Sequence, residues 1–143
     1  ASQGVIASYI HSGSTLGALV EVDCETDFVA RNEEFIAFAN DLAMHVAAAM
    51  PLYVSEEDVP AEEREAELRV LQEQDSDKPE EIRAKIAEGR IGKWLDEVCL
   101  LRQEHINSDK YEDRTIEELR ADLSSKTGEN VIIRRFARFA VGG

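Results

Sequence analysis

The stretch CETDFVARNEEF, from Cys24 to Phe35, decides how this chain folds. Apolar residues alternate before it as they do in a strand, and they recur after it at helical spacing. A junction between two such elements needs polar turn residues, yet Asp27 is followed at once by Phe28 and Val29. An aromatic side chain at this point is either packed into the core or displayed to a partner.

Upstream of the junction, residues 4–11 and 17–24 have the composition of two strands joined by a short loop that contains Gly13. In the second strand Val20, Val22 and Cys24 alternate with acidic residues. This alternation predicts one buried face and one solvated face.

The first strand is apolar on both faces. Ile6 and Ile10 lie on one face, and the other face carries Val5, Ala7 and Tyr9. Such a strand needs cover on both sides, which we expect from helices on one side and from a second copy of the chain on the other.

Downstream of the junction, Asn32 is a good N-cap for a helix from about Glu33 to Ala49, which Pro51 ends. Two further helices, at about 60–74 and 79–100, are predicted to pair as an antiparallel helical hairpin. The capping-box pattern Thr115-x-x-Glu118 predicts a last helix, which ends near Lys126.

The final segment, NVIIRRFARFAV over residues 130–141, is β-branched and aromatic and is predicted to form a third strand. One face is expected to carry Val131, Ile133, Ala137 and Phe139, and the other Arg134, Phe136 and Arg138. The predicted class is α+β: a small three-stranded antiparallel sheet covered by helices, with the helical hairpin of about 60–100 inserted before the last strand. Residues 1–143 are expected to form a single domain.

Composition excludes several classes of function. A formal net charge of −14 argues against direct binding of nucleic acid. The two cysteines form no CxxC pattern and the three histidines are scattered, so no metal site or cofactor is expected, and a reducing compartment is favoured. Neither a glycine-rich phosphate loop nor a GxSxG motif occurs, and the apolar runs are too short to span a membrane. The sequence therefore predicts a protein that is not an enzyme and has no membrane segment.

Two interpretations of Phe28 are open from pattern alone. The side chain either packs beneath the start of the helix as a hydrophobic staple, which is favoured about two to one, or inserts into a pocket of a partner, with Asp27 fixing its orientation.

Four stretches, in order, resemble the translation elongation factor Ts family. They are Thr26–Asn32 (TDFVARN), Ala43–Ala48 (AMHVAA), Lys85–Arg90 (KIAEGR) and Gly128–Phe136 (GENVIIRRF). The similarity extends from Gly4 to Gly142 and is greatest to the short, single-core form of the family.

The resemblance implies a guanine-nucleotide exchange factor that binds elongation factor Tu and promotes GDP release during translation. Thr26, Asp27, Phe28 and Val29 match the exchange motif, and Phe28 would be the side chain that inserts into the GTPase. His45 lies on a helix that in relatives helps to contact the partner. The alternative function is a structural dimerisation or docking module of a longer chain, without exchange activity by itself.

The chain departs from the family in places. No stretch matches the small helical module with which relatives normally begin, so we expect a core and dimerisation region without that module. Gly92 stands where relatives more often carry a basic residue, and residues 101–105 lack the family's Pro-Phe.

The resemblance also implies a homodimer formed through the sheets. The interface residues expected for it are Ile6, Ile10, Arg134, Phe136 and Arg138. The bacterial cytoplasm is the expected compartment, with a plastid or mitochondrion as the alternative.

Overall fold

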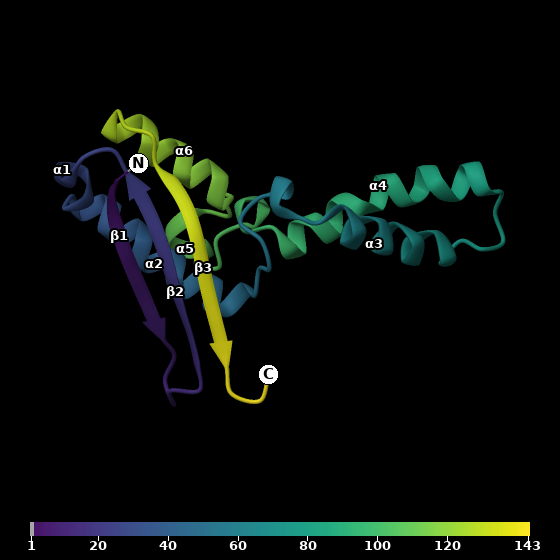
Figure 1. The fold of residues 1–143 in the computed structure, drawn as a ribbon, viewed down its shortest axis with the longest axis horizontal. Coiled ribbons are helices and arrows are strands. Elements are labelled where there is room, and N and C mark those ends of the chain that lie inside the picture. The colour runs from purple at the N-terminus through teal and green to yellow at the C-terminus, as the bar shows by residue number, and fades with distance from the viewer. Residues whose placement is uncertain (1) are drawn as a thin grey trace.

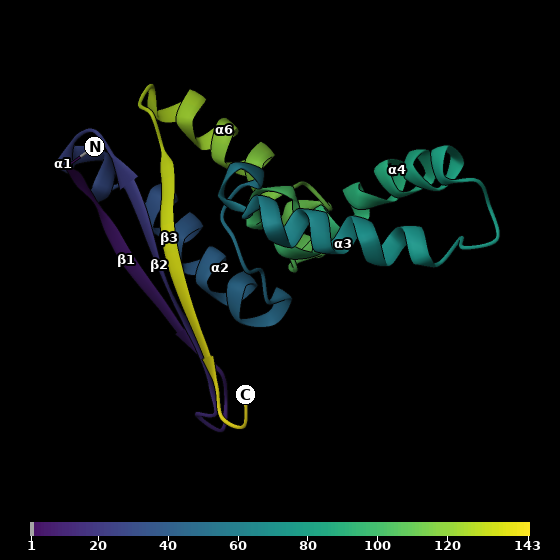
Figure 2. The ribbon, with the colours of Figure 1, turned by 45° about the vertical axis from the view of Figure 1, so that its right-hand side comes forward.

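The computed structural model describes residues 2–143 and has the predicted α+β class. Strands β1 (Gln3–Ile10), β2 (Leu16–Cys24) and β3 (Ile132–Ala140) form one antiparallel sheet in the order β1-β2-β3. Helices cover one face of this sheet and leave the other open, which is clearest in Figure 2.

Helix α2 (Glu33–Ala49) is the main element on the covered face and has the predicted bounds. The side chain of Asn32 accepts hydrogen bonds from the backbone N–H groups of Glu34 and Phe35, which confirms the predicted N-cap. The core between α2 and the sheet includes Val20, Val22, Phe35, Phe38, Leu42 and Val46.

Helix α6 (Ile116–Thr127) also contributes to this core. Thr115 and Glu118 form the predicted capping box at its start, and Gly128 ends it with a φ of 71°, a left-handed conformation that glycine adopts without a steric cost.

The predicted helical hairpin is present as α3 (Ala61–Glu73) and α4 (Glu80–Val98). Figure 1 shows it projecting far from the sheet. Leu71, Ala87 and Ile91 form a small core between the two helices. The two helices were expected to begin at about residues 60 and 79; in the structure Pro60 and Pro79 are the N-caps, and each helix begins one residue later.

Short elements complete the chain: α1 (Asp27–Ala30), η1 (Glu56–Asp58), η2 (Leu100–Arg102) and α5 (Ser108–Tyr111). The last two lie between α4 and α6, in the part of the chain that leads into segment 103–114 and within that segment. Gln103 and His105 in that segment are buried.

A β-bulge in β3 makes the predicted faces of that strand wrong. Glu21 pairs with Arg135 and Val22 pairs with Ile133, so Arg134 is an extra residue and the alternation of side chains changes there. Phe136 packs against the main core, and Arg138 Nε donates to the carbonyl oxygen of Ala47 at 2.9 Å.

One acidic residue of β2 also differs from the expectation. Asp23 was expected to be solvated and is only 7 % exposed. It pairs with Gly4 of β1. A side chain at position 4 would collide with Asp23, because a Cβ atom there would lie 2.9 Å from Asp23 Oδ1. Burial, and a hydrogen bond with Glu21, raise the pKa of Asp23.

Candidate functional site

The aromatic ring of Phe28 is displayed to solvent. It lies on the single turn α1 at one end of the sheet (Figure 1), and 76 % of the residue is exposed. The next two residues, Val29 and Ala30, are buried and anchor the turn from below. The structure therefore excludes the hydrophobic staple for Phe28 and agrees with display.

Thr26 begins this turn and serves as its N-cap. Its hydroxyl oxygen accepts a hydrogen bond from the N–H of Val29 at 3.3 Å. Asp27 faces solvent and forms an ion pair with Arg31 at 3.5 Å. An exposed pair of this kind contributes little to stability.

The turn is tied to the other end of the chain through Glu129, which the sequence analysis did not single out. One carboxylate oxygen of Glu129 accepts from the N–H groups of Glu25 and Thr26 at 3.0 and 3.1 Å, and the other accepts from the hydroxyl of Thr26 at 2.6 Å. Glu25 in turn accepts from the N–H of Asn130 at 2.6 Å. We call this reciprocal pair of contacts the Glu129 brace.

An open depression lies beside Phe28 and has a mostly polar lining. The residues that line it are Phe28, Val29, Asn32, Glu33, Glu34, Lys126, Thr127 and Glu129. An aromatic side chain beside carboxylates and one ammonium group is a mixture suited to a protein partner with basic and apolar groups.

His45 does not share this surface, contrary to the expected contact with a partner. It is 1 % exposed, on the inner side of α2. Its Nδ1 accepts from the N–H of Ile106 at 3.0 Å, so Nε2 carries the proton and donates to Gln103 Oε1 at 2.9 Å. The side chain joins α2 to segment 103–111 inside this chain and has no surface for a partner.

His105 extends the same interior network. Its Nδ1 accepts from the N–H of Asn107 at 3.0 Å, and Nε2 donates to the carbonyl oxygen of Asp41 at 3.1 Å. The ring lies 5.1 Å from that of His45 and 4.3 Å from that of Tyr111. Burial, helped by the neighbouring His45, lowers the pKa of His105 to about 4.

Asp41 closes the network at its solvent side. Its carboxylate accepts from the Tyr111 hydroxyl and from Lys110 Nζ, the latter at 2.7 Å. Although burial acts in the opposite direction, these two contacts lower the pKa of Asp41. The network is satisfied and interior, which is typical of a structural role.

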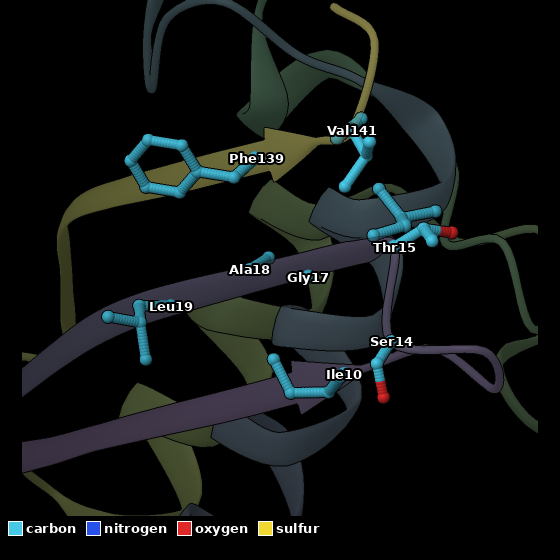
Figure 3. A pocket seen from close by; sticks show the side chains of 10 residues that line it. Ile10, Ser14, Thr15, Gly17, Ala18, Leu19, Phe139 and Val141 are labelled. Carbon is cyan, nitrogen blue, oxygen red and sulfur yellow. The ribbon is translucent and has the colours of Figure 1, made fainter.

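The open sheet face is the second surface feature, defined here by Ile6, Ile10, Leu19, Phe139 and Val141, all of which are at least 49 % exposed. Figure 3 shows Ile10, Leu19, Phe139 and Val141 around Gly17. The side chain of Ile10 lies over Gly17, where a Cβ atom would be 2.6 Å from Ile10 Cδ1. Of the residues expected at a dimer interface, Ile6 and Ile10 lie on this face, whereas Phe136 and Arg138 point to the helices.

The charged end of the same face is internally paired. Arg135 Nε contacts Glu21 Oε1 at 2.7 Å. Arg134, also expected at the interface, is the exposed bulge residue. Hydrogen bonds with Asp23 and Arg135 lower the pKa of Glu21. The face is therefore apolar towards the β1–β2 loop and polar towards α1.

Among residues 2–143, no helix is both long and apolar enough to cross a membrane.

Comparison with known proteins identifies relatives along nearly the whole chain. The family model described as elongation factor TS matches residues 1–112. Elongation factor Ts of Geobacter sulfurreducens is 49 % identical over 144 residues, and that of Syntrophus aciditrophicus is 52 % identical over 144 residues. Elongation factor Ts of Desulfotalea psychrophila is 49 % identical over 143 residues.

Each of these alignments covers 99 % of this chain, but 65 %, 70 % and 71 % of the respective relatives, so the chain spans about two thirds of their length. The relatives are bacterial translation factors by name, in agreement with the expectation of a protein that is not an enzyme. On the strength of these matches, this chain belongs to the elongation factor Ts family.

Proposed function

We propose that this chain binds elongation factor Tu and promotes the release of GDP from it. The single observation that carries the proposal is Phe28, a large apolar ring that is 76 % exposed on a turn anchored by the buried Val29 and Ala30. A displayed aromatic side chain on a rigid support is the typical anchor of a protein interface.

An exchange factor of this kind needs no reacting group of its own. It has to bind the nucleotide-free partner more tightly than the nucleotide-bound partner, and linkage then lowers the affinity of the partner for GDP by the same factor. One buried aromatic anchor contributes about 2–4 kcal/mol, which corresponds to a factor of roughly 30 to 1,000 in an equilibrium.

The test is the release of a fluorescent GDP from elongation factor Tu, followed with and without this chain. Phe28→Ala should remove most of the acceleration. Leu52→Ala is the matched control, because Leu52 is also exposed and apolar, at 64 %, but follows the other end of α2. If Phe28→Ala accelerates release as well as the unmodified chain does, Phe28 is not the anchor and the proposal loses its main support.

The second candidate is a docking and dimerisation module without exchange activity by itself. The open sheet face favours it, because contiguous exposed apolar side chains mark interaction surfaces. This candidate predicts that the chain binds elongation factor Tu and leaves GDP in place.

Either function is compatible with a homodimer, which we propose forms through the open sheet face. Phe139→Asp should give a monomer in sedimentation or light scattering at micromolar concentration, whereas Leu52→Asp should not change the mass. A monomeric unmodified chain at that concentration would contradict the dimer. For the compartment we propose the cytoplasm of a bacterium, where elongation takes place.

A further inference from the structure

The support of Phe28 is too short to be stable by itself. Helix α1 has four residues, whereas isolated helices need roughly 12–15 residues to be even marginally stable in water. Tertiary contacts must therefore hold it: the buried Val29 and Ala30 anchor the end of the turn, and its start needs a contact of its own.

The Glu129 brace provides such a contact at the start of the turn. The carboxylate of Glu129 accepts from the N–H groups of Glu25 and Thr26 and from the hydroxyl of Thr26, at distances between 2.6 and 3.1 Å. The hydroxyl of Thr26 donates to Glu129, and its oxygen also accepts from the N–H of Val29, which caps α1. One side chain from the α6–β3 turn thus fixes both the backbone entering α1 and its capping group.

Glu129 is itself held in place by contacts of its own backbone and of its neighbour. The carboxylate of Glu25 accepts from the N–H of Asn130. The hydroxyl of Ser124, on α6, donates to the carbonyl oxygen of Glu129. The Thr26 hydroxyl and the two amides lower the pKa of the Glu129 carboxyl group, so these contacts favour its charged form.

We infer that Glu129 is a positioning residue for Phe28: it holds α1 in the one orientation in which the ring can enter a pocket of the partner. The inference rests on the proposed exchange function. Without the brace, Phe28 remains exposed, but the turn has to be ordered when the partner binds, and that ordering reduces affinity.

The test combines Glu129→Ala, Glu129→Gln and Phe28→Ala with the double variant Glu129→Ala/Phe28→Ala. Glu118→Ala is the matched control. Glu118 accepts from the N–H of Thr115, the N-cap of α6, at 2.9 Å, just as Glu129 accepts from the N–H of Thr26, the N-cap of α1. Helix α6, however, does not carry Phe28. Circular dichroism checks that each variant is folded.

The first readout is made on the chain without a partner. Amide hydrogen exchange at Glu25 and Thr26 should become faster in Glu129→Ala and should be unchanged in Glu118→Ala. Unchanged protection at both amides would overturn the inference, because the brace would then not order the turn.

The second readout is GDP release from elongation factor Tu at subsaturating concentration of the chain. Loss of charge-assisted hydrogen bonds predicts a roughly tenfold lower rate for Glu129→Ala. Glu129→Gln should recover part of the lost rate of GDP release, because the side-chain amide oxygen still accepts from the N–H groups of Glu25 and Thr26. In the Phe28→Ala background, removal of Glu129 should have almost no further effect.

Three results separate the possible failures. A Glu129→Ala variant as active as the unmodified chain overturns the inference alone. A loss of equal size with and without Phe28 overturns it in favour of direct contact between Glu129 and the partner. An unmodified chain that neither binds elongation factor Tu nor releases GDP overturns the proposed function, and the inference with it.

Discussion

Acidification should destabilise this fold through His105. The ring is 3 % exposed, and its Nδ1 accepts from the N–H of Asn107, a contact that requires the neutral form. A proton added to Nδ1 would oppose the N–H of Asn107, which donates to that atom, and would place a charge 5.1 Å from the ring of His45.

The size of the effect follows from the two pKa values of His105. In the unfolded chain the imidazole takes up a proton near its ordinary value of 6.5, and in the folded chain only near 4. Between these values the unfolded state binds more protons, so the free energy of unfolding falls as the pH falls. This loss amounts to about 2 kcal/mol at pH 5 and roughly 3 kcal/mol once the pH is below 4. His45, whose pKa burial also lowers, acts in the same direction.

The assay is chemical denaturation at pH 7.5 and pH 5, with His105→Asn beside the unmodified chain. At pH 7.5 the variant should be less stable than the unmodified chain, because one hydrogen bond is gone. On acidification to pH 5, the free energy of unfolding of the variant should fall by about 2 kcal/mol less than that of the unmodified chain. An equal loss in the unmodified chain and His105→Asn would refute the reasoning, as would an NMR titration in which the His105 ring is protonated near 6.5.

Three further predictions concern stability, measured by denaturation at neutral pH. Phe28→Ala should change the free energy of unfolding by less than about 0.5 kcal/mol, because the ring is exposed; a larger loss would show that it packs in the core. Asn32→Ala should cost about 1 kcal/mol, because two amides of α2 lose their acceptor, and Asn32→Ser should restore most of it. Leu42→Ala should cost about 2–5 kcal/mol, because the side chain is fully buried between α2 and the sheet; a cost below 1 kcal/mol would mean that the core closes around the missing atoms.

Local signals predicted the elements well. Asn32 and Pro51 bound α2 correctly, Thr115 marked the start of α6, and the alternation in β2 gave the correct buried residues Val20 and Val22. Each signal acts within a few residues along the chain, through a cap or a repeat, so no knowledge of distant segments was needed.

The faces of β3 and the surroundings of the histidines could not be predicted in this way. The bulge at Arg134 depends on the register with β2, which lies more than 100 residues earlier, and it changes the side on which Phe136 and Arg138 lie. His45 was placed at a partner surface by resemblance, but segment 103–111 folds over it and supplies its hydrogen bonds.

The sequence by itself determined the order and type of the elements, the α+β class and the motif that carries the family resemblance. Only the tertiary structure decided whether Phe28 is displayed and what holds it there. The physical reason is separation along the chain: Glu129 and Thr26 are 103 residues apart, and no periodicity or cap connects them. Their contact exists only because the sheet brings the end of β2 beside the start of β3.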